Sequence, residues 1–218
     1  MQFDVLTLFP GAIEPYLESS ILGRAQKSEL ITTRLWDIRN YSTDKHKTVD
    51  DTPYGGGAGM VMKIEPVDRA LTAATQDTNT STKRVVVLSA RGQQFTQTKA
   101  KEYAALDQLI LICGRYEGVD HRIVEHLADE ELSVGPYVLA GGEIAALVVI
   151  EATARLIPGV LGNEESLTEE SHTEPGVIEA PQYTKPEEYK GWRVPEVLLS
   201  GNHQAIKQWR KEDSGSLK

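Results

Sequence analysis

The stretch LILICGRYEGVD, residues 109–120, joins a continuous apolar run to a turn punctuated by two glycines. Similar runs stand on either side of it: residues 85–88 precede it, and a weaker run, residues 132–139, follows it. Helical patterns separate the three runs, at residues 96–106 and 119–127. Continuous apolar strands that alternate with helices are typical of a parallel sheet covered on both faces. The sequence therefore predicts an α/β fold, a parallel sheet flanked by helices.

The residues outside this centre predict a main domain, a linker and an appendage. Further strands are expected at residues 5–9 and 30–36, and helices at residues 66–74 and 142–156. After Pro158-Gly159 the pattern is lost. We therefore assign residues 1–159 to the main domain, residues 160–181 to a linker, and residues 182–218 to a small helical C-terminal domain. In that last domain Thr184 to Glu187 has capping-box spacing, and Asn202 is placed to cap a helix through Trp209.

The charge is distributed unevenly along the chain. The 218 residues carry 32 acidic and 23 basic side chains, for a formal net charge of −9. Residues 117–180 hold 14 of the acids and only two basic residues, Arg122 and Arg155. An acidic middle suits a cationic small molecule, and mildly basic ends suit a polyanion, although a surface of solvated charges would give the same counts.

Several classes of protein are disfavoured by what the sequence lacks. The single cysteine, Cys113, allows no internal disulfide and fits a reducing compartment; it is expected to be a core residue of its strand. No signal peptide is visible, and no apolar run approaches the length of a membrane span. We expect a cytoplasmic protein without a membrane partner.

Three glycine-containing segments follow the three apolar runs, at residues 89–92, 114–118 and 134–142. In parallel sheets ligands bind beyond the carboxyl ends of strands, where glycines let backbone groups approach a ligand closely. Ordinary strand-to-helix turns also require glycine and are the alternative. The sequence lacks both G-x-G-x-x-G after the first strand and G-x-x-x-x-G-K-[ST], which disfavours a Rossmann dinucleotide site and a P-loop.

Five segments of the chain together resemble one known family. They are DDTPYGGGAGM (50–60), LILICGRYEGVD (109–120), VGPYVLAGGE (134–143), RLIPGVLGN (155–163) and VLLSGNH (197–203). In this order, and over essentially the whole chain, the sequence is similar to the bacterial tRNA (guanine-N1)-methyltransferases, the TrmD family of the SPOUT class. The resemblance implies a deep trefoil knot, S-adenosylmethionine as the methyl donor, and an obligate homodimer with composite active sites.

The resemblance also implies which residues hold the methyl donor. They follow the three apolar runs and are Leu88, Ser89, Gly114, Tyr116, Glu117, Val134, Gly135, Pro136, Tyr137, Val138, Leu139, Gly141 and Gly142. A pocket without strong positive charge would suit the sulfonium of the donor. An acid at the position of Glu117 is linked to magnesium dependence in the family, so Mg²⁺ is a further candidate cofactor, and no direct metal ligands are expected. Glu117 could instead be a carboxylate at a helix N-terminus.

Methylation at N1 of guanine requires a base to remove the N1 proton and a cation or donor at O6. The resemblance assigns these roles to Glu170 and Arg155. Glu170 departs from the family pattern, which has aspartate before the serine, here Ser171; the extra methylene shifts the carboxylate by roughly 1 Å, enough to slow catalysis. A solvated acidic loop is the alternative for Glu170, and an ion pair within the helix is the alternative for Arg155.

The remaining implied contacts are with tRNA, through its anticodon arm and with guanosine 37 as the target. The candidate residues lie in two loops and the last helix: Lys45, His46, Tyr54, Gly55, Gly56, Lys207 and Arg210. The sequence stops at Lys218, whereas members of the family run on through further helical residues. The shorter end and Glu170 motivate a second hypothesis, a weakened or non-catalytic RNA-binding relative, and a methyltransferase acting on another RNA is a third.

Overall fold

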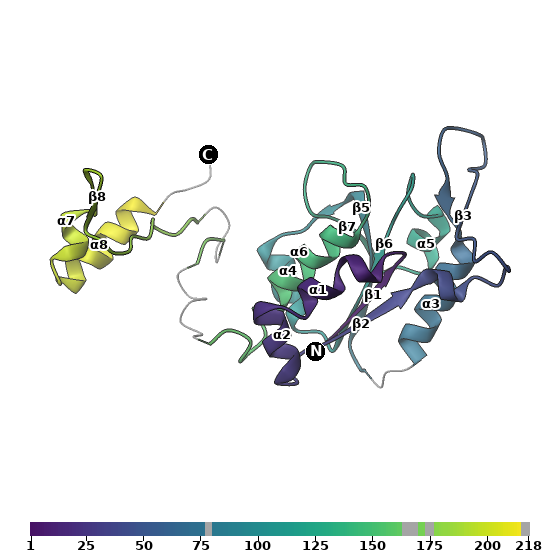
Figure 1. Ribbon diagram of the computed structural model, residues 1–218, viewed down its shortest axis with the longest axis horizontal. Helices are drawn as coiled ribbons and strands as arrows, with labels where there is room; N and C mark the ends of the chain where they lie inside the picture. The colour runs from purple at the N-terminus through teal and green to yellow at the C-terminus, as the bar shows by residue number, and fades with distance from the viewer. Residues whose placement is uncertain (77–79, 163–169, 173–176, 215–218) are drawn as a thin grey trace. The chain divides into compact units, whose positions relative to one another are not determined.

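The computed structural model describes residues 1–76, 80–162, 170–172 and 177–214. The chain divides into two compact units, Met1–Gly162 and Asn163–Lys218, and each is considered by itself. The first unit is an α/β domain, in which helices cover both faces of a central sheet (Figure 1). The predicted α/β class, a parallel sheet flanked by helices, is therefore confirmed.

All strands of the central sheet run parallel, in the order β2-β1-β6-β5-β7. Their bounds are β1 Gln2–Thr7, β2 Thr32–Asp37, β5 Lys83–Gln94, β6 Gln108–Cys113 and β7 Glu130–Ser133. The central strand β6 is buried along its whole length. Leu111 and Cys113 face one apolar cluster, and Ile110 and Ile112 face another on the opposite side. This is why the strand reads as a continuous apolar run.

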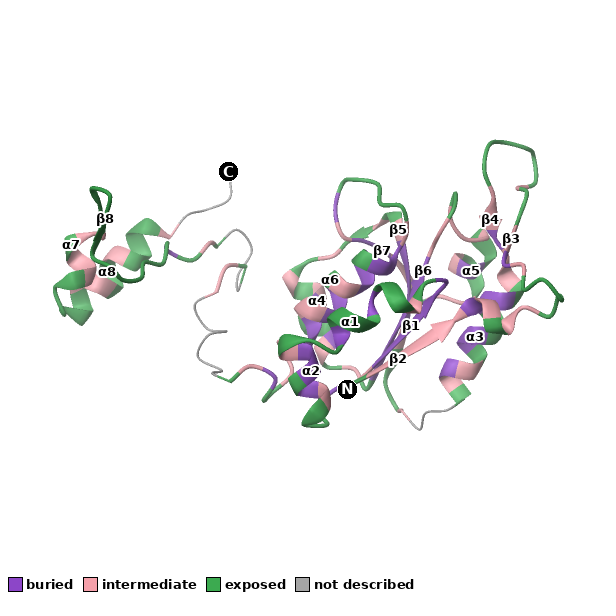
Figure 2. Ribbon diagram, viewed as in Figure 1, coloured by how far each residue is buried: buried purple, intermediate pink, exposed green. Residues whose placement is uncertain are grey.

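The helices form one layer on each face of the sheet (Figure 2). One layer contains α1 Glu14–Leu17, α2 Ser20–Lys27, α4 Gln97–Ala104 and α6 Glu143–Ala154. The other contains α3 Ile64–Gln76 and α5 His121–His126. The side chain of Thr96 accepts a hydrogen bond from Lys99 N and so caps α4, close to where the pattern predicts that helix. In the part of the chain that the structure describes, no helix is long and apolar enough to cross a membrane.

The apolar run at residues 132–139 is not a strand along its whole length. The strand β7 ends at Ser133, which corrects the prediction. There the Ser133 hydroxyl donates to Gly135 O over 2.9 Å and accepts from Gly135 N over 3.3 Å, which turns the chain out of the sheet. The partner strand β5 is irregular at the same level: its pairing with β7 shifts between Leu88 and Gln93. A loop therefore follows β7, whereas β5 continues to Gln94 with residues 89–92 unpaired with β7.

A small antiparallel ladder joins β3 Asp50–Asp51 to β4 Val61–Met62 and holds the glycine-rich loop between them. Met62 N donates to Gly118 O over 2.9 Å, and Met62 pairs with Val119 in an isolated parallel bridge. Short 3₁₀ turns lie at Pro10–Ala12 and Ile38–Tyr41. The ladder thus attaches the glycine-rich loop to the segment that follows β6.

The second unit contains strands as well as helices, which corrects the expectation of a purely helical appendage. Its elements are the hairpin β8 Glu188–Tyr189 and β9 Trp192–Arg193, then α7 Glu196–Leu199 and α8 His203–Asp213. The capping-box spacing of Thr184 to Glu187 is misleading, because a hairpin follows it. The Asn202 cap is confirmed, since its Oδ1 accepts a hydrogen bond from Ala205 N over 3.2 Å.

Candidate functional site

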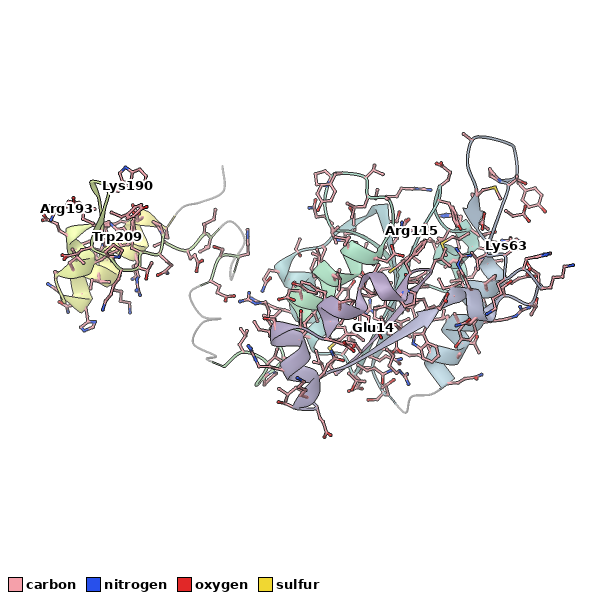
Figure 3. All side chains as sticks on the ribbon, viewed as in Figure 1. Glu14, Lys63, Arg115, Lys190, Arg193 and Trp209 are labelled. Atoms are coloured by element: carbon pink, nitrogen blue, oxygen red, sulfur yellow. The ribbon has the colours of Figure 1, made fainter. Side chains whose placement is uncertain are left out.

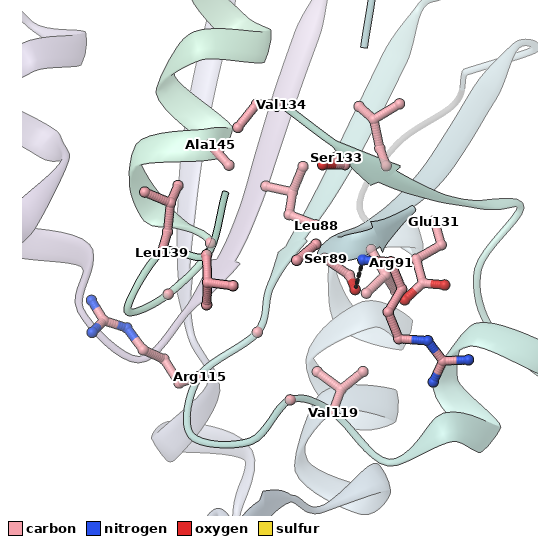
Figure 4. Close-up of a pocket in the computed structure, with 18 of the residues that line it drawn as sticks. Leu88, Ser89, Arg91, Arg115, Val119, Glu131, Ser133, Val134, Leu139 and Ala145 are labelled. Carbon is pink, nitrogen blue, oxygen red and sulfur yellow. Dashed lines mark hydrogen bonds between the residues drawn. The ribbon is translucent and has the colours of Figure 1, made fainter. Parts of the chain in front are cut away.

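A cavity of about 290 Å³ lies beyond the carboxyl ends of β6 and β7 and beside the irregular part of β5 (Figure 4). It is lined by residues 87–91, 114–119, 131–135 and 137–142, with His121, Val124 and Ala145. The three glycine-containing segments of the sequence therefore converge on one pocket. This position is where ligands bind in parallel α/β sheets.

The structure brings together all but one of the residues predicted to hold the methyl donor. Leu88, Ser89, Gly114, Tyr116, Glu117, Val134, Gly135, Tyr137, Val138, Leu139, Gly141 and Gly142 line the pocket. Pro136 is exposed and is not among the lining residues. Their role as ligand contacts stays a prediction.

The sequence reasoning missed several polar lining residues, among them Arg91, Arg115, His121 and Glu131. Both arginines stand inside glycine-containing segments, which was an available signal: Arg115 lies in the turn after β6, whereas Arg91 lies within β5, which continues through residues 89–92, where a turn was predicted. Glu131 was missed because the apolar run was predicted to begin at Leu132, whereas β7 begins at Glu130. The two arginines also correct the expectation of a pocket without strong positive charge, although the charge of Arg115 is balanced by an acid beside it.

The two loops that form the pocket contact each other through their backbones. Gly142 N donates a hydrogen bond to Gly114 O over 2.9 Å. A Cβ atom added at Gly142 would lie 2.6 Å from Cys113 Cα, closer than such atoms approach in proteins. Glycine is therefore required at residue 142 for the loop after β7 to reach the end of β6.

A buried ion pair connects three elements at the edge of this pocket. Arg115 Nε donates to Glu143 Oε2 over 2.9 Å, and the Thr7 hydroxyl donates to Glu143 Oε1 over 2.8 Å. The Glu143 side chain is only 3% exposed, so both of its oxygens are satisfied within the protein. The Arg115 guanidinium also lies 4.5 Å from the centre of the Phe9 ring. These contacts join the end of β1, the turn after β6 and the first residue of α6.

Cys113 lies at the end of β6 and is completely buried. Burial raises the pKa of its thiol well above the usual value, and the nearby Glu143 carboxylate raises it further. A thiol that stays protonated is a poor nucleophile. These features agree with the expected role of Cys113 as a core residue.

Glu117 lies between the pocket and the glycine-rich loop. Its N–H donates to Met60 O over 3.0 Å, and a Cβ atom at Gly59 would lie 2.5 Å from Glu117 Cγ. Glu117 is not the carboxylate that caps the next helix: Asp120 is the N-cap of α5, and a hydrogen bond from the Arg122 side chain lowers the pKa of Asp120. The glycine-rich loop is thus packed against a residue that lines the pocket.

The predicted catalytic pair belongs to two different units. Arg155 is the C-cap residue of α6 in the first unit, and Glu170 belongs to the second unit. Both side chains are partly buried. In the described ranges, no three His, Cys, Asp or Glu side chains gather as they would around a metal ion.

The residues predicted to contact tRNA are all exposed. Lys45 and His46 lie in the loop after Ile38–Tyr41, where Asp44 accepts hydrogen bonds from His46 N and Thr48 N. Tyr54 is fully exposed, and it precedes Gly55 and Gly56 in the loop between β3 and β4. Lys207 and Arg210 lie on α8 in the second unit. Their role in binding RNA stays a prediction.

Comparison with known proteins assigns this arrangement to a family. The sequence profile of the tRNA (Guanine-1)-methyltransferase TrmD family matches residues 1–216. The chain belongs to this family. The resemblance inferred from the five motifs is thereby confirmed.

Relatives within the family cover nearly the whole chain. A tRNA (guanine-N(1)-)-methyltransferase of Ruminiclostridium cellulolyticum is 51% identical over 214 residues, which are 98% of this chain and 91% of the relative. A relative with the same name from Chloroflexus aggregans is 51% identical over 98% of this chain and 82% of the relative. Another, from Geobacillus kaustophilus, is 48% identical over 98% of this chain and 86% of the relative. The family's members are thus named for methyl transfer to guanine N1 in tRNA.

Proposed function

We propose that this protein transfers the methyl group of S-adenosylmethionine to N1 of guanosine 37, the nucleotide 3′ of the anticodon in tRNA. The proposal rests on one observation above the others. Relatives that share about half of their residues with 98% of the chain are named tRNA (guanine-N1)-methyltransferases. The pocket beyond β6 and β7 supports it, because two of the five motif segments, residues 109–120 and 134–143, contribute to its lining.

The residues of the pocket fit S-adenosylmethionine. The lining combines apolar side chains, such as Leu88 and Leu139, with backbone groups of glycine-containing turns and with the carboxylates of Glu117 and Glu131. Such a mixture can enclose an adenosine, read the edge of its base and lie near a cationic sulfonium. When bound, S-adenosylmethionine supplies an electrophilic methyl group. Mg²⁺ is a candidate second cofactor, through Glu117.

In this mechanism the chain's own residues prepare N1 of guanine. The Glu170 carboxylate accepts the N1 proton, and the ring nitrogen becomes a nucleophile. Negative charge then develops on O6, where the Arg155 guanidinium stabilises it. With S-adenosylmethionine bound, the deprotonated N1 would take its methyl group, and the products would be N1-methylguanosine and S-adenosylhomocysteine.

We further propose a homodimer with composite active sites. The exposed face of α6 carries apolar side chains at helical spacing: Ile144 is 58% exposed and Val148 is 43% exposed. The pocket loop beside it presents Tyr137, Val138 and Leu139, all exposed as well. An apolar surface of this kind on a helix indicates a protein interface. A second copy that covered it would place residues of both chains around one pocket.

The remaining assignments follow the family. Residues 1–159 form the SPOUT domain with its trefoil knot, residues 160–181 the linker that carries Glu170, and residues 182–218 a domain that binds the anticodon arm. Lys45, His46 and the Tyr54 loop contact tRNA from the first unit. The protein acts in the cytoplasm, where tRNA is modified.

The test is methyl transfer from labelled S-adenosylmethionine to an unmodified tRNA transcript that has G at position 37. A transcript with A37 is the control. We expect label on the G37 transcript alone. Absence of label with a dimer that binds S-adenosylhomocysteine would refute the enzymatic proposal and revive the alternative of a non-catalytic relative, whereas label on both transcripts would refute the position.

A further inference from the structure

The hairpin of the second unit presents two aromatic rings side by side. Tyr189 and Trp192 pair directly across the turn, and their ring centres are 5.9 Å apart with planes inclined by 56°. Lys190 and Gly191 form the turn, with φ of 54° and 85°. Positive φ at both central residues is the geometry of the tight turn that suits a two-residue hairpin. The turn therefore fixes both rings on one face of the hairpin.

A cross-strand aromatic pair helps to stabilise a short hairpin, but here most of the ring surface remains uncovered. Tyr189 is 55% exposed and Trp192 is 72% exposed. The other tryptophan of the second unit, Trp209, is partly buried and lies 6.4 Å from the ring of Tyr183. The packing of this unit thus uses Trp209, and it leaves the Trp192 ring accessible to solvent.

A lysine accompanies the exposed rings. Lys190 Nζ lies 5.3 Å from the centre of the Tyr189 ring, whereas the charge of Arg193 is balanced by Glu188, whose Oε2 lies 3.3 Å from Arg193 Nε. Figure 3 labels the side chains of Lys190, Arg193 and Trp209 in this unit. Exposed aromatic rings with adjacent cations are the combination with which proteins bind unpaired nucleotides, since bases stack on the rings and phosphates approach the cations.

We propose that Tyr189, Lys190 and Trp192 form a stacking platform for an unpaired base of the RNA substrate. The Trp192 ring stacks on the base, and Lys190 contacts the neighbouring phosphate. The inference rests on the proposed function, in which the substrate is tRNA. An unpaired base with its phosphate matches both the flat exposed ring and the positive charge of Lys190. A contact with a second protein copy would not require this combination.

The first experiment measures the affinity of the full-length protein for an unmodified G37 tRNA transcript as salt is varied. Trp192→Ala should weaken binding about tenfold with an unchanged salt dependence, and Trp192→Phe should retain most of the affinity because it keeps a ring. Lys190→Ala should reduce the slope of log affinity against log salt by about 0.7. Lys27→Ala, an exposed lysine on α2, is the matched control and should leave the slope unchanged.

The second experiment observes the ring itself and uses the conservative variant Trp192→Phe, which keeps an aromatic side chain in the hairpin. A stem-loop RNA of the anticodon arm should quench tryptophan fluorescence in the wild type but much less in Trp192→Phe. A blunt RNA duplex of the stem, which has no unpaired bases, should give no such difference. Wild-type affinity in Trp192→Ala together with equal quenching in both proteins would overturn the proposal.

Two outcomes separate this inference from the proposed function. If Trp192→Ala raises KM for tRNA while kcat at saturating tRNA stays near the wild-type value, the platform contributes to binding, as proposed. If Trp192→Ala instead changes the oligomeric state in sedimentation, the hairpin is a contact between copies and the inference is wrong. A failure of methyl transfer by the wild type would count against the proposed function alone, since quenching is measured without it.

Discussion

At the residue scale, the ion pair of Arg115 and Glu143 supports the edge of the pocket. Glu143 is a buried carboxylate, and its oxygens accept from Arg115 and from Thr7. A buried charge of this kind is tolerable only while its partners are in place. Because the pair connects the ends of β1 and β6 to the start of α6, it also holds the two pocket loops at a fixed separation.

Replacing Arg115 with alanine should therefore cost both stability and ligand affinity. Arg115→Ala leaves the buried Glu143 charge uncompensated, and we expect a loss of about 3–5 kcal/mol in the free energy of unfolding, measured with urea. Arg122→Ala is the matched control: it removes an arginine from the exposed pair with Asp120 and should leave the free energy of unfolding nearly unchanged. Equal losses in the two variants would contradict the role given to the buried pair.

Glu170 is the residue whose chemistry most needs a direct test. Glu170→Ala should slow single-turnover methyl transfer by at least roughly a hundredfold, because no carboxylate then accepts the N1 proton. Glu170→Asp should remain active, since it keeps the acid. Glu179→Ala, an exposed acid of the same unit, should transfer methyl at the wild-type rate. A wild-type rate in Glu170→Ala would remove Glu170 as the base.

At the scale of elements, the sequence predicts best where one local pattern decides the outcome. The runs at β5 and β6 and the helix between them follow from apolar periodicity and from the Thr96 cap. The position of β7 beside β5 does not follow from any local pattern, because strand order is set by contacts between distant residues. The hairpin at residues 188–193 was missed for a different reason: strands of two residues are too short to show a period.

The candidate site, too, could be predicted from the sequence only in part. The glycine-containing turns after β6 and β7 could be predicted as a pocket, because both follow apolar runs and parallel strands end at one edge of the sheet. The pairing of Arg115 with Glu143 could not, since the two residues are 28 positions apart and no local pattern connects them. The convergence of the glycine-rich loop on Glu117 likewise needed the fold.

The contact between the two pocket loops gives a prediction at this scale. In Gly142→Ala the new Cβ meets the Cys113 backbone, which cannot move without disturbing β6, so the loop after β7 must shift. We expect the affinity for S-adenosylhomocysteine, measured by calorimetry, to fall at least about tenfold. Gly162→Ala is the control, because nothing lies within 4 Å of the added atom. Unchanged affinity in Gly142→Ala would show that the close approach is not needed for binding.

At the scale of the whole molecule, the two units divide the proposed chemistry. The first unit carries the pocket and Arg155, and the second carries Glu170, the aromatic hairpin and the cations of α8. If Glu170 is the base, as proposed, it must be brought to the pocket of the first unit. The proposed assembly of two copies through the apolar face of α6 would provide one way, because each pocket would then lie at a surface shared with the other chain.

In the proposed assembly, methyl transfer requires the dimer. Ile144→Asp with Val148→Asp places two carboxylates on the exposed face of α6, where each would be buried unpaired in a dimer, so we expect a monomer in sedimentation and a loss of methyl transfer of at least about a hundredfold. Because both side chains face solvent in the single chain, the double variant should still fold, with a circular dichroism spectrum like that of the wild type. Thr72→Asp, which adds a charge to the exposed side of α3, should remain dimeric and active. A monomeric double variant with wild-type activity would mean that one chain completes its own site.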